Sequence, residues 1–183
     1  MRSFIQQVFP KRNLDALPAA AVGFIIILLY TRHSGIGVSP DSVVYMSAAR
    51  NIHSHGTLLD FNERPLVVFP AFYPFFLSIG IFLTGLDPMT YAPALNALLF
   101  AMVILISGRI MEGFLIRSTW QKQAVLSCMA LSPCLLEVYS MLWSETLFIL
   151  LLLAFFITVR SYLQSGITKG KVLGFESKKS KLY

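Results

Sequence analysis

Five apolar segments dominate the sequence and restrict what the chain can fold into. They are residues 16–30, 66–86, 88–108, 123–136 and 146–159. A helix needs about 20 apolar residues to cross the hydrocarbon core of a bilayer, with a lower limit of about 17. The second and third segments reach that length unaided, and the other three reach it with flanking residues. The pattern is typical of an all-α integral membrane protein that crosses the bilayer several times.

Composition supports this class and excludes ordinary soluble ones. Hydrophobic residues make up 56% of the chain and charged residues 13%, whereas about 25% of the residues in soluble domains are charged. The net charge of +6 does not indicate a nucleic-acid partner, because the basic residues lie between and after the apolar segments. Cys128 and Cys134 lie in or beside one apolar segment, so we expect no disulfide framework.

The distribution of lysine and arginine restricts the topology. If all five segments cross and the N-terminus is cytoplasmic, three of the 15 basic residues lie inside and twelve outside, which contradicts the positive-inside rule. Twelve lie inside if segment 66–86 does not cross, or if all five cross with the N-terminus outside. Charge alone does not separate these two arrangements, and the short basic N-terminal tail favours the first.

Segment 66–86 differs from the other apolar segments in its prolines and glycines. Pro70 and Pro74 come early, and Gly80 and Gly85 come late. Proline lets a helix start in the interface instead of continuing through it. We therefore predict an interfacial or re-entrant helix on the outer side; the alternative is a proline-containing span.

The predicted fold is thus a helical bundle of four transmembrane helices, or five if segment 66–86 crosses. We place the spans at about 14–31, 88–108, 123–140 and 143–162, within an N-terminal transmembrane module of residues 1–163. Residues 164–183 are basic and polar, and we expect them to form a disordered tail.

The longest polar stretch, 31–65, contains a predicted surface helix. Ser39 is suited to the N-cap, Pro40 to the first helical position and Asp41 to the first turn. The helix should run over residues 41–54 and end at Gly56. We expect this loop on the outer side and residues 109–122 on the inner side.

A few charged residues at the predicted outer surface are candidates for chemistry. Asp41 can act as a base or bind a divalent cation, although a carboxylate in a first turn also simply stabilises its helix. Glu137 and Glu145 flank the turn between the last two segments, and interface anchoring is the alternative for both. Arg50 and Arg64 can contact a phosphate or lipid headgroups.

Histidines 53 and 55 are not expected to form a metal pair. Two residues apart, they point to different sides of a helix. No phosphate-binding glycine loop, Ser/His/Asp arrangement or zinc spacing occurs in the sequence.

Several stretches resemble GT-C fold glycosyltransferases, in particular bacterial relatives of the dolichyl-phosphate-mannose protein mannosyltransferases and of the aminoarabinose transferases. The first, Pro-Asp-Ser-Val-Val-Tyr-Met-Ser-Ala-Ala-Arg-Asn-Ile at 40–52, is similar to the first outer loop of that group. Phe-Pro-Ala-Phe-Tyr-Pro at 69–74 is similar to the start of its next apolar helix. Leu-Ser-Pro at 131–133 and Trp-Ser-Glu-Thr-Leu-Phe at 143–148 are similar to the pattern around its second outer loop. The resemblance covers about residues 10–163.

This resemblance implies a reaction and a site. A sugar would move from a polyprenyl-phosphate donor to an acceptor on the outer face, with inversion. Asp41 and Glu145 match the acidic positions of the first and second outer loops, and a divalent cation is an optional cofactor. Many members carry a second acidic residue where Ser42 stands, which weakens a paired-carboxylate metal site.

The resemblance also implies an incomplete protein, because relatives run to several hundred residues with many more spans. We therefore expect a truncated copy with no measurable transfer of its own. The competing interpretation is a small non-catalytic membrane protein, such as a scaffold or the subunit of a complex. A transporter fragment is disfavoured, because the charged residues lie between or at the ends of the apolar segments.

Overall fold

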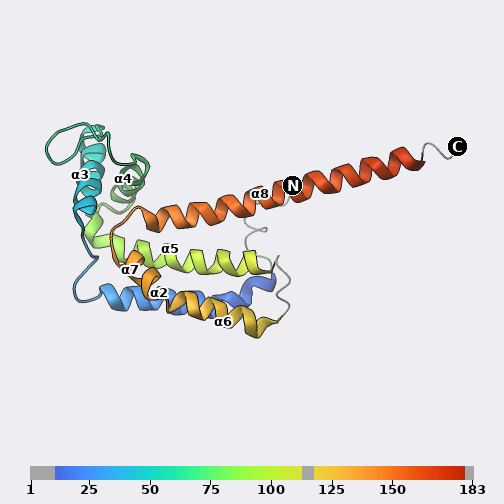
Figure 1. Cartoon of the computed structure of the whole chain (residues 1–183). Helices are drawn as coiled ribbons and strands as arrows, with labels where there is room; N and C mark the ends of the chain where they lie inside the picture. Colours follow the sequence, from blue (N-terminus) through green and yellow to red (C-terminus); the bar gives the residue numbers. More distant parts are fainter. Residues whose placement is uncertain (1–10, 113–117, 180–183) are drawn as a thin grey trace.

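The computed structural model describes residues 11–112 and 118–179, and these residues are mainly helical (Figure 1). In chain order the helices are η1 (Lys11–Ala16), α2 (Leu17–Thr31), α3 (Pro40–His55), α4 (Phe72–Thr84), α5 (Pro88–Met111), α6 (Thr119–Ala130), α7 (Pro133–Ser140) and α8 (Glu145–Lys179). Two isolated β-bridges are the only strand-type pairings in these residues. The predicted all-α membrane bundle is therefore confirmed.

Among the described residues, three helical segments are long and apolar enough to cross a bilayer. They cover Leu14–Thr31, Pro88–Met111 and Glu145–Leu163. Helices α6 and α7 together pass the same test but are bent by 50° at the intervening break. The sequence predicts one span over 123–140, and the structure divides this segment into two helices. The first ends at Ala130 and the second starts at Pro133, because proline has no N–H for a continuing helix. The described residues contain up to four spans if this bent pair is one of them.

The surface helices α3 and α4 lie together at one end of the bundle (Figure 1). The same end holds the last turn of α2 and the first turns of α5 and α8, so segment 66–86 does not pass through the bundle. Arg50 of α3 forms an ion pair with Asp87, the N-cap of α5, at 2.8 Å. Helix α4 begins only at Phe72 and ends at Thr84, and its C-cap is Gly85, whose φ of +68° suits glycine.

Helix α5 forms the centre of the bundle, with contacts to α2 and α8 along its length. Its residues Phe100 and Ile104 are fully buried. A Cβ on Gly23 of α2 would lie 2.5 Å from the side chain of Ile104, so glycine allows this close approach. The ring of Phe100 also stacks on Tyr139 of α7 with centroids 4.7 Å apart.

The end opposite α3 and α4 holds four charged side chains, which we call the charge cluster: Asp15, Arg109, Glu112 and Lys122. The Lys122 ammonium lies 2.7 Å from the Asp15 carboxylate and 3.0 Å from that of Glu112. Arg109 contacts Glu112 at 2.9 Å, and Gln123 donates a hydrogen bond to the backbone carbonyl of Asp15. The side chain of Lys122 is only 5% exposed.

Helix α8 continues beyond the bundle to Lys179 (Figure 1). We had expected a disordered tail from residue 164. Residues 164–179 contain no proline. Their three glycines lower helix propensity without removing a backbone donor.

Candidate functional site

A cavity of about 210 Å³ opens between the start of α3 and the start of α8. Its lining consists of Ser39, Pro40, Asp41, Tyr45, Trp143 and Glu145. Two segments that lie about a hundred residues apart in the sequence thus contribute to one site. The structure brings together Asp41 and Glu145, the two carboxylates singled out from the sequence.

A capping box fixes the α3 side of the cavity. The Ser39 hydroxyl accepts a hydrogen bond from the Ser42 backbone N–H, and the Ser42 hydroxyl accepts one from the Ser39 backbone N–H at 3.0 Å. Pro40 occupies the start of the helix and Asp41 its first turn, as predicted. Because the start of α3 is fixed in this way, the Asp41 carboxylate has a defined place beside the cavity.

Side-chain hydrogen bonds connect the α8 side to α3. The Trp143 indole N–H donates to the Ser39 hydroxyl at 2.9 Å, and the Tyr45 hydroxyl donates to Ser144 at 3.4 Å. The Ser144 hydroxyl in turn donates to the Glu145 carboxylate at 3.3 Å. These contacts hold Trp143 and Glu145 against the first turns of α3.

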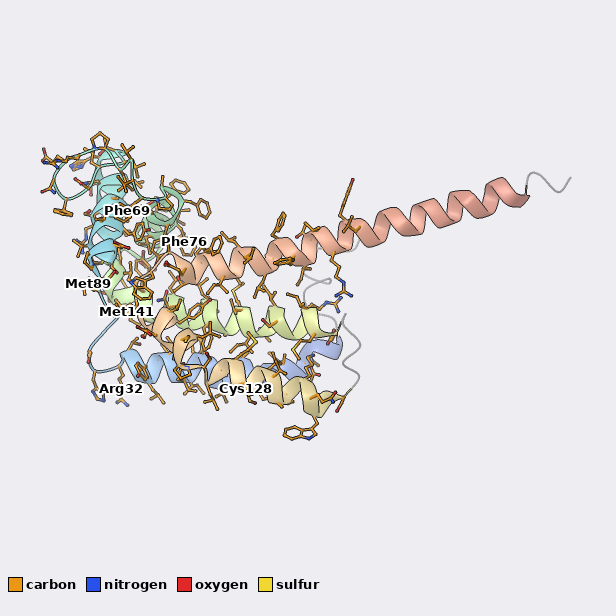
Figure 2. The ribbon with its side chains drawn as sticks, in the orientation of Figure 1. Arg32, Phe69, Phe76, Met89, Cys128 and Met141 are labelled. Carbon is orange, nitrogen blue, oxygen red and sulfur yellow. The ribbon has the colours of Figure 1, made fainter. Side chains whose placement is uncertain are left out.

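Backbone hydrogen bonds also connect the segment before α3 to the segment before α8. The Gly37 N–H donates to the Ser140 carbonyl at 2.8 Å, and the Leu142 N–H donates to the Gly37 carbonyl at 2.9 Å. We call this pairing of Gly37 with residues 140–142 the clasp. A Cβ on Gly37 would lie 2.1 Å from the sulfur of Met141, so a larger residue at position 37 would require the Met141 side chain to move. Figure 2 shows Met141 at the same end of the bundle as Phe69 and Phe76.

The electrostatics of the cavity are uncompensated within the described chain. Neither Asp41 nor Glu145 takes part in an ion pair there, and both are exposed. Each carboxylate lies in the first turn of its helix, beside the partial positive charge of the helix N-terminus. Two like charges that share one cavity favour binding of a positive group, or of hydroxyl donors.

An aromatic cluster packs around Tyr45, one of the residues that line the cavity. The ring of Tyr45 packs edge-on against Phe69 and Tyr73, with centroid distances of 5.6 and 5.2 Å. Burial raises the pKa of the Tyr73 hydroxyl, so this group stays protonated at neutral pH. The cluster connects the motif at 69–74 to the α3 wall of the cavity.

The two arginines predicted to contact a phosphate do not line the cavity. Arg50 lies nine residues beyond Asp41, about 13 Å along the helix, and its partner is Asp87. Arg50 holds the pKa of the Asp87 carboxyl below its ordinary value. Arg64 has an exposed side chain in a loop where its backbone N–H donates to the Asp60 carboxylate.

The other sequence candidates also lie outside the cavity. Glu137 is exposed on α7. His53 lines a separate, mainly apolar hollow of about 250 Å³ between α3 and α4. Across residues 11–112 and 118–179, no group of three His, Cys, Asp or Glu side chains could hold a metal ion. A divalent cation at Asp41 would therefore need oxygen ligands from water or substrate as well.

Trp143 and Tyr45 are site residues to which the sequence reasoning gave no role. Both lie within the stretches that carry the family resemblance, and Trp143 lies in the turn between Glu137 and Glu145. An aromatic residue beside an acidic one at a membrane border was therefore an available signal.

Comparison with known proteins identifies no relative: no family model, curated protein or solved structure matches the chain.

Proposed function

We propose that the chain is the N-terminal part of a GT-C-like membrane glycosyltransferase that uses a polyprenyl-phosphate sugar as donor. The observation that carries this proposal is the cavity in which Asp41 and Glu145 lie together. The order of the sequence motifs supports it, because the stretches at 40–52 and 143–148 supply the two walls.

The chemistry of the two carboxylates suits the transfer. When the acceptor hydroxyl attacks the anomeric carbon, its oxygen forms the new glycosidic bond and the bond from that carbon to the phosphate oxygen breaks. Asp41 would accept the proton of the acceptor hydroxyl. Glu145 would orient the sugar hydroxyls or share a cation with Asp41. The leaving polyprenyl phosphate keeps the bonding electrons.

The position of the cavity fits a lipid-linked donor. It lies where α8 begins and beside α4, which is apolar but too short to cross. Helix α4 exposes Phe72, Phe75 and Phe82, which are suited to the boundary between headgroups and acyl chains. A donor phosphate at this depth would place its sugar in the cavity and its prenyl chain in the bilayer.

Photo-crosslinking tests this proposal. The purified chain in lipid nanodiscs is irradiated with a polyprenyl-phosphate hexose that carries a diazirine on the sugar. We expect adducts on residues 39–45 and 143–145, and unlabelled donor should suppress them whereas polyprenol should not. Adducts spread over the outer face of α8 and insensitive to donor would contradict the proposal.

A second candidate is a non-catalytic subunit of a membrane complex. The observation in its favour is that only 17% of the spanning window of α8 is buried, against 50% for α5. Helix α8 therefore lies at the edge of the bundle, where a partner helix could pack. This candidate predicts no donor-specific adducts in the same experiment.

A further inference from the structure

Asn96 is a polar side chain in the first half of the central helix α5, and it is fully buried. Its side-chain amide donates two hydrogen bonds, to the backbone carbonyl of Tyr139 at 3.0 Å and to that of Met141 at 2.8 Å. Its Oδ1 has no hydrogen-bond partner within the described chain. The side-chain amide of Asn96 thus donates through its nitrogen, and its oxygen accepts no hydrogen bond from the described residues.

The energetics of this arrangement indicate what the side chain is for. A buried polar atom without a partner is destabilising, so an apolar residue would be favoured at position 96 if packing were the only requirement. The two carbonyls that Asn96 serves lie at the end of α7 and just beyond it, where helical N–H partners run out. The two N–H donors satisfy groups that would otherwise be unpaired beside an apolar core.

The two carbonyls belong to the segment that carries one wall of the cavity. Met141 is the residue that bridges to Gly37 in the clasp, and Trp143 and Glu145 follow within four residues. The position of this segment decides whether the Trp143 indole can reach Ser39 across the cavity. Asn96 therefore anchors the α8 wall to α5, and the clasp anchors the same wall to α3.

We infer that Asn96 is a positioning residue for the cavity, acting through the backbone of residues 139–141 on Trp143 and Glu145. Asn96 does not itself line the cavity. Its importance for sugar transfer rests on the proposed function, whereas its effect on the geometry of the cavity does not.

Fluorescence of Trp143 gives a direct readout of this geometry. The chain has two tryptophans, so Trp120→Phe leaves Trp143 as the single reporter. In that background Asn96→Leu removes both donors, and we expect emission at longer wavelength and stronger quenching by acrylamide as the indole leaves Ser39. Asn96→Asp, which is nearly isosteric and lacks the two N–H groups, should shift emission in the same direction even if the leucine variant fails to fold.

Asn51→Leu is a matched control. The Asn51 side chain donates to two backbone carbonyls, those of Leu59 and Asp60, but at the far end of α3. Its loss should leave the emission of Trp143 unchanged. The inference would be overturned if the Asn96→Asp variant had the same emission as the parent. It would also be overturned if Asn51→Leu shifted the emission of Trp143 to the same extent.

Donor photo-crosslinking of the parent chain separates the two proposals. If the Asn96 variants shift Trp143 while the parent gives no donor-specific adducts, the positioning role stands and the proposed function falls. If the parent gives the adducts and the Asn96 variants leave Trp143 unchanged, the proposed function stands and the positioning role falls.

Discussion

Carboxylates gather at both ends of the bundle, but the two ends treat them differently. In the charge cluster, Lys122 lies within 3.0 Å of two carboxylates and is itself nearly buried. In the cavity, Asp41 and Glu145 share an open space, and the described chain supplies no cation to either. We interpret the first arrangement as structural, because its charges cancel within the protein, and the second as a site whose counter-charge or hydrogen-bond donors come from a ligand.

The comparison also involves the connections around each group. The charge cluster joins η1, α5 and α6 directly through its ion pairs. The cavity is held by groups around the carboxylates, namely the capping box, the Trp143–Ser39 hydrogen bond and the clasp. Removing a charge should therefore destabilise the first end and leave the second folded.

The largest expected difference between the two ends is their accessibility from outside the cell. With Cys128 and Cys134 replaced by serine, we expect a cysteine at Ser54 to react fully with an impermeant maleimide in intact cells. A cysteine at Ser118, near the charge cluster, should react only after permeabilisation. Both serines are exposed, so exposure within the protein does not limit the reaction. Labelling at Ser118 but not at Ser54 would contradict the topology.

Loss of the central cation should have the largest effect on stability. Lys122→Met leaves Asp15 and Glu112 without their shared ammonium, and breaking such a buried pair costs about 3 kcal/mol. Thermal unfolding in detergent, followed by far-ultraviolet circular dichroism, measures this loss. Asp41→Asn removes a charge at the other end and should leave the midpoint unchanged; equal losses in the two variants would remove the distinction between the ends.

A smaller loss is expected when the cavity end loses its helix cap. Ser39→Ala removes the capping oxygen of α3 and the acceptor of the Trp143 indole, which should destabilise the chain by about 1 kcal/mol. Ser118→Ala is the control, because Ser118 is the N-cap of α6 but makes no capping hydrogen bond. A loss as large for Ser118→Ala would mean that the hydrogen bonds of Ser39 contribute nothing.

The smallest effect should come from the Arg50–Asp87 pair, whose side chains are 49% and 41% exposed. Arg50→Met should lower stability by less than about 1 kcal/mol. Because Arg50 lowers the folded-state pKa of Asp87, the contribution is complete above the ordinary value of 3.8 and is lost as the pH falls below it. The unfolding midpoints of the parent and of Arg50→Met should therefore differ at neutral pH and converge at acid pH.

Much of the fold follows from the sequence because membrane helices depend on local properties. The apolar segments with their flanking residues predict spans at about 14–31, 88–108 and 143–162, and the structure has apolar helices over Leu14–Thr31, Pro88–Met111 and Glu145–Leu163. The Ser-Pro-Asp start of α3 follows from capping chemistry. The break between Ala130 and Pro133 was not predicted, because hydropathy measures apolarity and not the direction of a helix. The continuation of α8 to Lys179 was missed for a related reason, since polarity was taken as a sign of disorder.

The candidate site was predicted less completely, because it depends on which segments meet. The four-span arrangement, which the family resemblance also implies, predicts Asp41 and Glu145 at the same end, and the structure has both in one cavity. The pairing of Arg50 with Asp87 could not be anticipated, since it requires knowing that α5 starts beside α3. Counting Lys122 as a topology determinant likewise gave no information on its ion pairs. The buried Asn96, a polar residue inside an apolar segment, was a further available signal that went unused.

Donor titration tests the central claim, that the two carboxylates form a ligand site, most directly. The Trp120→Phe chain in nanodiscs is titrated with a short polyprenyl-phosphate hexose while the emission of Trp143 is followed. A hydrogen bond to a charged group contributes about 1.5–3 kcal/mol, so the Asp41→Asn/Glu145→Gln variant should bind about tenfold more weakly or worse. Glu137→Gln, on an exposed glutamate outside the cavity, should bind as the parent does. A saturable change in Trp143 emission with that loss of affinity is the predicted result; no saturable change, or equal affinity in the double variant, would contradict the account.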